Sequence, residues 1–193
     1  RKLFSSKLFW ILAVLMFASG ASELSMSQWA SAFAESGLGV SKTVGDLAGP
    51  CFFAVLMGCA RVVYAKFGDR LNLLNVEILS SLLCVAAYLL AALSPIPALA
   101  LLGCGLCGFS VGVMWPGTIS VAARYLPKGG TAMFALLALF GDLGCSGGPT
   151  LVGMVSGAMG GALKTGLLFA ILFPALLIAA ALICKKALKK RAE

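Results

Sequence analysis

The sequence predicts an all-α membrane protein of six transmembrane helices, and three observations support this fold class. The 193 residues are 61% hydrophobic and 11% charged, with a mean hydropathy of +1.02. A soluble domain carries about a quarter charged residues, and a soluble chain this apolar would expose large aggregating surfaces. The apolar residues form runs of about 20 or more, the length that a helix needs to cross a bilayer. The basic residues gather mainly between and after these runs.

The first predicted helix covers residues 8–35, because its apolar run continues until Gly37 and Gly39 break the pattern. The second predicted helix covers residues 43–67. It carries Pro50 near its start, which is where a helix tolerates proline best.

Turns rich in polar residues, proline and glycine separate the next helices. The polar turn GDRLN at residues 68–72 precedes the third predicted helix, over residues 73–93. The proline hairpin SPIP at residues 94–97 then leads into the fourth, over residues 98–125. The turn LPKGG at residues 126–130 ends that helix.

The last two predicted helices cover residues 131–159 and 164–184. The basic segment KKALKKR follows the sixth helix, where cytoplasmic anchoring charge belongs. No stretch between the apolar runs is long enough for a soluble domain, so we expect one six-helix domain over residues 1–193.

The basic residues predict the orientation. With six spans both termini lie on one side of the membrane, and that side receives twelve of the 15 basic residues. These are Arg1, Lys2, Lys7, Lys66, Arg70, Arg124, Lys128, Lys185, Lys186, Lys189, Lys190 and Arg191. The other side receives Lys42 and Lys164, and Arg61 belongs clearly to neither. By the positive-inside rule we expect both termini to be cytoplasmic.

The composition argues against several other classes of protein. The seven cysteines lie in apolar runs, and Cys104 and Cys107 lack the second ligand pair that a metal site needs. Ser146 lies in a G-x-S-x-G pattern, but the chain has no histidine to serve as its base. No phosphate-binding glycine loop is present, and the net charge of +8 is distributed as membrane anchors rather than as a nucleic-acid surface. We therefore expect no enzyme activity, cofactor, metal or nucleic-acid partner.

A polar stripe runs along the first predicted helix. Its members recur every four residues: Ser19, Glu23, Ser27 and Ser31. Gln28 and Trp29 follow within two turns of Glu23. Such a stripe can bind a polar solute through hydrogen bonds and ring stacking in a hydrated cavity. The alternative is an interhelical hydrogen-bond network, worth about 1 kcal/mol per contact.

Two later helices contain features that predict broken helices within the membrane. In the fourth helix Pro116 removes a backbone donor beside Trp115, so we expect the helix to bend or unwind there. In the fifth helix the run GDLGCSGGP at residues 141–149 combines Asp142 with glycines and Pro149, so we expect a second disrupted span. Interrupted helices in related positions indicate a transport site.

These features together resemble half of a major facilitator superfamily (MFS) transporter. The similarity rests on six spans, on FGDRL (67–71) after the second span, on the G-x-x-x-G-x-M-W-P run of the fourth span and on the glycine- and proline-rich fifth span. Within the superfamily the chain is most similar to the C-terminal half of the fucose-permease-like branch. That branch carries a GFxxxxMxP run, which matches Gly108, Phe109, Met114 and Pro116 here.

The resemblance implies a fold and a set of functional residues. Each half of such a transporter is a 3+3 inverted repeat whose first and fourth helices line a central path. The expected pathway residues are Glu23, Ser27, Gln28, Trp29, Trp115, Thr118 and Asp142. The turn after the second helix resembles the cytoplasmic loop motif of the superfamily, although Asn72 replaces its second glycine. This similarity implies gating roles for Asp69 and Arg70. On physical grounds we expect Asp69 to pair with Arg124 or another inner-side cation in one conformation, and the alternative is a solvated turn.

The expected function is secondary-active transport of a small solute, such as a sugar or a related metabolite, by alternating access. Members of the superfamily have about twelve spans, so we expect an N-terminal six-helix half as a partner, in the same longer chain or as a second subunit. We expect symport across the plasma membrane, with the lipid bilayer and the solute as the other partners. The alternatives are a drug or metabolite efflux carrier, or a non-transporting membrane scaffold subunit.

Overall fold

The computed structural model describes residues 3–192, without the side chains of residues 37, 69 and 190–192. All regular elements in this part of the chain are helical, which confirms the predicted all-α class. Six segments are long and apolar enough to cross a membrane, as predicted. They are Lys7–Ser36, Lys42–Phe67, Leu73–Leu93, Pro97–Tyr125, Pro127–Ala158 and Leu163–Lys189.

Interruptions divide these spans into shorter elements. The α-helices are α1 (Lys7–Ser27), α2 (Ala30–Ala32), α3 (Lys42–Asp46), α4 (Phe52–Phe67), α5 (Leu73–Leu93), α6 (Pro97–Val111), α7 (Met114–Tyr125), α8 (Gly130–Ala158), α9 (Leu163–Ala170) and α10 (Leu172–Ala192). The π-helical turns η1 (Phe33–Gly37) and η2 (Leu47–Cys51) continue α2 and α3, and the 3-10 turns η3 (Gly68–Arg70) and η4 (Pro127–Gly129) follow α4 and α7.

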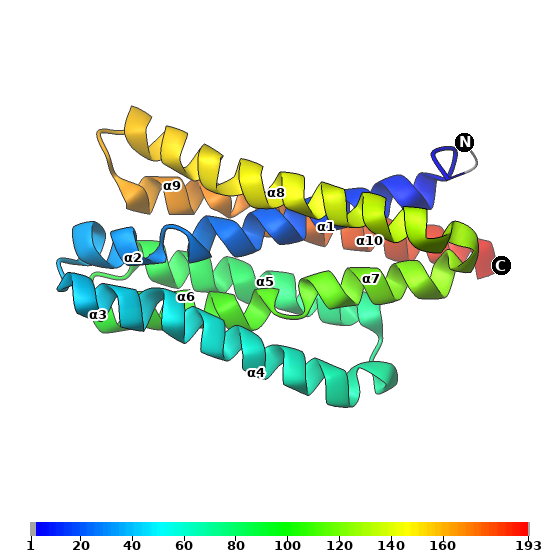
Figure 1. Cartoon of the computed structure of the whole chain (residues 1–193), viewed down its shortest axis with the longest axis horizontal. Helices are drawn as coiled ribbons and strands as arrows, with labels where there is room; N and C mark the ends of the chain where they lie inside the picture. Colours follow the sequence, from blue (N-terminus) through cyan, green and yellow to red (C-terminus); the bar gives the residue numbers. More distant parts are fainter. Residues whose placement is uncertain (1–2, 193) are drawn as a thin grey trace.

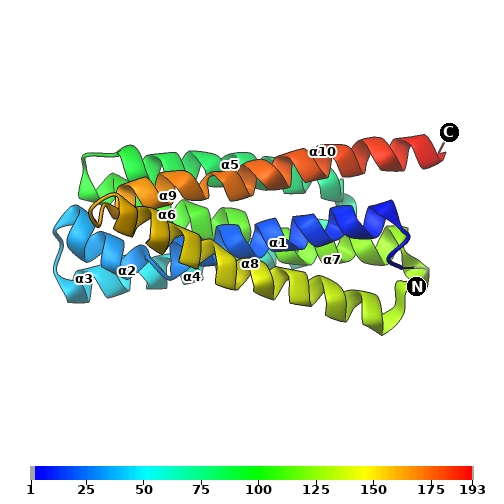
Figure 2. The same ribbon diagram turned by 90° about the horizontal axis from the view of Figure 1, so that it is seen from above.

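The helices run side by side along one long axis, and both termini lie at the same end (Figure 1). We call this end the inner end, and it also holds the α4–α5 and α7–α8 turns. Seen from above, α5 and α10 lie on one side of the bundle and α4, α7 and α8 on the other (Figure 2). The helix α1 contacts α6, α7, α8, α9 and α10, and 67% of the most apolar stretch of its span is buried. The second and fifth spans are the most exposed, with 17% and 22% of that stretch buried.

The fourth span breaks between α6 and α7, as the sequence predicts. Pro116 has no N–H, and in a regular helix its ring would clash with the carbonyl four residues earlier, at Gly112, so the hydrogen-bond ladder cannot continue through this point. Regular bonding resumes where the Gly117 N–H donates to the Val113 carbonyl at 2.8 Å.

The prediction of a disrupted fifth span is wrong, because α8 is a continuous helix through residues 141–149. The glycines of this segment serve helix packing instead. A Cβ atom on Gly144 would collide with the carbonyl oxygen of Phe17 in α1. A Cβ atom on Gly148 would lie 2.7 Å from the carbonyl oxygen of Ala21. Small residues spaced three and four apart let two membrane helices approach closely, so the glycine run forms the contact between α8 and α1.

The first span, Lys7–Ser36, agrees with the predicted residues 8–35, but it is interrupted between the end of α1 at Ser27 and the start of α2 at Ala30. The interruption falls at Trp29, whose backbone adopts φ −96° and ψ −7°. The indole N–H of Trp29 donates to the carbonyl oxygen of Pro149 at 2.9 Å. This bond ties the interruption in the first span to α8.

The α1–α8 contact predicts which glycines of α8 can be replaced. We expect Gly144→Ala to lower the free energy of unfolding by about 1–3 kcal/mol, because the added methyl group meets backbone that cannot move aside. The control is Gly157→Ala in the same helix, where no atom lies within 4 Å of an added Cβ. Thermal unfolding in detergent measures both variants, and equal melting temperatures would contradict this account of the contact.

Candidate functional site

An ion pair joins the first and second spans. The Glu23 carboxylate in α1 lies 3.9 Å from the Arg61 guanidinium in α4, measured between Oε1 and Nη2. Among the side chains that the structure describes, it is the one ion pair. The Glu23 side chain is 15% exposed and that of Arg61 is 48% exposed. The pair therefore lies at an open face of the bundle, and the guanidinium is the more accessible partner.

Arg61 also borders a groove of about 510 Å³ between α4 and α7. The groove is lined by Tyr64, Trp115, Pro116 and Ile119 in addition to Arg61. The indole nitrogen of Trp115 is buried and has no hydrogen-bond partner among the described residues. A cation beside an aromatic side chain gives this groove both a polar and an apolar wall.

The helix α8 contacts α7 at Trp115. Gly141 lies against the Trp115 ring, where a Cβ atom would sit 2.7 Å from Cη2 of the indole. The next residue, Asp142, is exposed. Glu23, Arg61, Trp115 and Asp142 thus come from α1, α4, α7 and α8. The helices α4, α7 and α8 lie on one side of the bundle, and α1 lies in its middle (Figure 2). We call these four residues the polar face.

The other predicted pathway residues of the first span differ in how far their side chains are exposed. Ser27 is partly exposed and Gln28 is exposed at the interruption after α1. Trp29 is partly buried, and its N–H is already bonded to the Pro149 carbonyl. Within the predicted polar stripe, Ser19 is fully buried. The stripe therefore crosses from the interior of the bundle to its open face.

A second acidic site lies closer to the inner end. Glu77 in α5 is 1% exposed, and its Oε1 accepts a hydrogen bond from the Thr118 hydroxyl at 3.2 Å. The other carboxyl oxygen has no hydrogen-bond partner among the described residues. Thr118, a predicted pathway residue, is thus engaged with α5. The sequence identifies Glu77 only as a charged residue within a span, because Thr118 reaches it through the fold.

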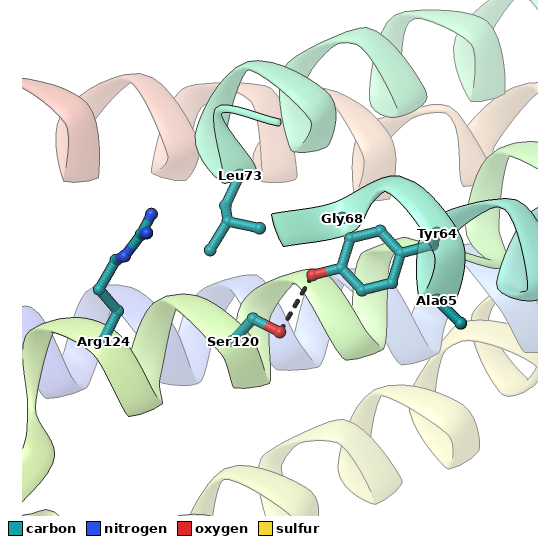
Figure 3. Close-up of a pocket in the computed structure, with 6 residues that line it drawn as sticks. All are labelled: Tyr64, Ala65, Gly68, Leu73, Ser120 and Arg124. Atoms are coloured by element: carbon teal, nitrogen blue, oxygen red, sulfur yellow. Dashed lines mark hydrogen bonds between the residues drawn. The ribbon is translucent and has the colours of Figure 1, made fainter. Parts of the chain in front are cut away.

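A smaller cavity of about 230 Å³ lies at the inner end, between α4, α5 and α7 (Figure 3). Arg124 lines it, and the Tyr64 hydroxyl donates to the Ser120 hydroxyl across it at 3.0 Å. Of the other predicted gating residues, Arg70 is exposed in the turn before α5. The side chain of Asp69 lies outside the described residues.

The cysteine and acidic side chains do not form a metal site in the part of the chain that the structure describes. Cys104 and Cys107 are buried, and the Cys107 sulfur lies 3.9 Å from that of Cys84. The Ser146 hydroxyl donates to the backbone carbonyl of Asp142 at 3.0 Å. These groups make contacts within and between helices, whereas the Glu23–Arg61 pair lies where the Arg61 side chain is nearly half exposed.

The chemistry of the polar face suits binding of a small polar molecule. A carboxylate accepts hydrogen bonds, a guanidinium donates up to five, and an indole offers a flat apolar surface. No reaction is needed for such a site to act, because transport requires only binding on one side of the membrane and release on the other.

Comparison with known proteins identifies the family. The family model described as Major Facilitator Superfamily matches residues 1–149 of the 193-residue chain. No curated protein and no solved structure matches the chain. The narrower similarity to the fucose-permease-like branch stays a prediction. The family match and the six membrane-spanning segments agree on one conclusion: this chain belongs to the Major Facilitator Superfamily of membrane transporters.

Proposed function

We propose that this chain forms one six-helix half of a secondary-active transporter that moves a small polar solute by alternating access. The observation that supports this proposal most strongly is the Glu23–Arg61 pair, because Arg61 also lines the groove between α4 and α7 that contains Trp115. A sugar or a closely related metabolite fits this chemistry best, because its hydroxyl groups bond to the ion pair while one face of its ring stacks on the indole.

The cost of placing charge in a bilayer supports a hydrated path. A charged side chain at the bilayer centre costs about 2.5–3.5 kcal/mol on insertion scales. Arg61 lies within the second span, and nearly half of its side chain is exposed. Asp142 is exposed within the fifth span. These charges are stable if the polar face borders water or another protein surface rather than lipid.

The same face supports a second six-helix half as partner. The polar face carries residues from the second and fifth spans, which are the two least buried in this chain. A partner that packs over these spans would enclose the polar face and leave a path between the two halves. The partner is either part of the same longer protein or a second subunit.

We further propose symport in the plasma membrane, driven by an ion gradient, with the inner end in the cytoplasm. The basic residues support this orientation, because Lys66, Arg124, Lys128 and Lys185 lie near the inner end and Lys164 near the opposite end. Glu23 could carry a proton or bind the solute directly.

Uptake measurements test the proposal. The full transporter that contains this chain is reconstituted into proteoliposomes and supplied with labelled sugars under an imposed proton gradient. Accumulation of one sugar supports symport. Export of drugs or metabolites without sugar uptake would identify an efflux carrier. Zero flux of every solute, together with stable binding of the partner half, would identify a scaffold subunit and overturn the proposal.

The first variant to examine is Glu23→Gln, which keeps the shape of the side chain but removes its charge. We expect solute affinity to fall about 10- to 100-fold, since a hydrogen bond to a charged group contributes about 1.5–3 kcal/mol. Titration calorimetry measures the affinity, and the melting temperature checks folding. The matched control is Glu35→Gln, which removes an exposed acid near the far end of the same span. Wild-type affinity in Glu23→Gln would reduce the polar stripe to a packing feature.

Orientation is tested by labelling single cysteines in a cysteine-free background. Lys186→Cys reports on the inner end and Lys164→Cys on the opposite end of the same span. A membrane-impermeant maleimide should label Lys186→Cys in inverted vesicles only, and Lys164→Cys in right-side-out vesicles only. The reverse pattern would contradict the proposed cytoplasmic location of the termini.

The gating role is tested by Asp69→Asn. We propose that Asp69 pairs with Arg124, or with another cation at the inner end, in one of the two conformations of the transporter. The variant should shift the balance between inward-open and outward-open states, with little change in solute affinity. Cysteine labels at the inner end report this shift, and unchanged accessibility would count against the pairing.

A further inference from the structure

A second cavity at the inner end, of about 290 Å³, combines three basic side chains. It lies where α5 begins and α7 ends against α10. Arg124 comes from the end of α7, and Lys185 and Lys189 come from α10. Asn72 and Tyr125 add polar groups to its wall. The cavity is distinct from the polar face, although it shares Leu73 and Arg124 with the smaller cavity of Figure 3.

The charge of this cavity is not balanced by an ion pair among the described side chains. Lys185 donates to the neutral Asn75 amide oxygen at 2.8 Å. No described acidic side chain pairs with Arg124, Lys185 or Lys189. Like charges that share a cavity repel one another, so an anion that enters it relieves that repulsion. An arginine with two lysines is well suited to a phosphate group, because the guanidinium can bond two phosphate oxygens at once.

The surroundings favour a phosphate that is attached to a lipid. Leu182, Lys185 and Lys189 recur at intervals of three and four residues, so they lie along one face of α10. The Leu182 side chain is 52% exposed, and that of its neighbour Ile183 is 56% exposed. An acyl chain can therefore lie on this apolar surface while its headgroup reaches the two lysines. Basic pockets between transmembrane helices bind anionic phospholipid headgroups in this way.

We propose that this cavity binds the phosphate group of an anionic phospholipid, and that Arg124, Lys185 and Lys189 hold it. None of the polar-face residues lines this cavity, but its Arg124 is also the proposed gating partner of Asp69. Binding would attach the inner ends of α7 and α10 to the same lipid molecule, and so couple the position of α7 to the composition of the membrane.

The test measures lipid binding to the full transporter in detergent by native mass spectrometry. Phosphatidylglycerol is the probe, and phosphatidylcholine is the zwitterionic reference. The triple variant Arg124→Gln, Lys185→Gln and Lys189→Gln should lower the affinity for phosphatidylglycerol about a hundredfold, at about fivefold for each cation removed. The three side chains are exposed, so the variant should fold. Its melting temperature in detergent without added lipid confirms this.

The matched control is the double variant Lys42→Gln and Lys164→Gln, which removes exposed or partly exposed cations near the opposite end and should leave phosphatidylglycerol binding unchanged.

Inorganic phosphate serves as the second arm of the experiment. Weak binding of free phosphate together with a loss of lipid binding in the triple variant supports the lipid site. Free phosphate that binds as tightly as phosphatidylglycerol would overturn the lipid assignment in favour of a soluble anion. Equal lipid binding by the triple variant and the wild type would overturn the site itself.

Discussion

The close approach of α1 to α8 is the constraint on which the rest of the structure depends. Lipid tails are as apolar as leucine side chains, so two membrane helices associate through close packing rather than through the hydrophobic effect. Glycine permits that packing on both helices here. Gly20 lies against the backbone of α8 at Gly141, and Gly144 lies against the backbone of α1 at Phe17. The rotation of α1 is thereby fixed, and Glu23, which follows Gly20 by one turn, is directed toward Arg61.

The acidic side chains of Glu23 and Glu77 both lie within spans, but they differ in what surrounds them. Glu77 is sealed between α5 and α7, where Gly117 leaves room for its carboxyl group and Thr118 donates to it. Such a group joins two helices but offers no surface to a solute. Glu23 has a cation as its partner and keeps part of its surface open, as does Arg61 to a larger extent. An ion pair of this kind can exchange one of its contacts for a contact with a solute without leaving a buried charge unpaired.

The sequence predicts the all-α class and the six spans correctly, because runs of apolar residues are local features that a bilayer requires. The break before Pro116 is predictable for a similar reason, since a missing N–H acts within its own helix. The run at residues 141–149 also combines glycines with a proline, and yet α8 continues through it. A glycine can interrupt a helix or let a second helix approach it closely, and the outcome depends on what packs against the glycine. In α8 the glycines pack against α1. The sequence does not reveal the pairing of Arg61 either, because its partner Glu23 lies on another span and the two meet only in the fold.

The broken and the unbroken helix act together in forming the groove. The interruption between α6 and α7 frees α7 from the direction of α6, so that Trp115 can lie against Gly141 of α8. The same helix contacts α7 through Gly141 and α1 through Gly144 and Gly148. Because α8 is continuous, these glycines keep fixed positions relative to one another. One continuous helix thus contacts two neighbours, and the Trp115 that it contacts also lines the groove between α4 and α7. The break before Pro116 and the glycine contact thus act on different helices: the break sets the direction of α7, and the contact with α8 sets the position of α1.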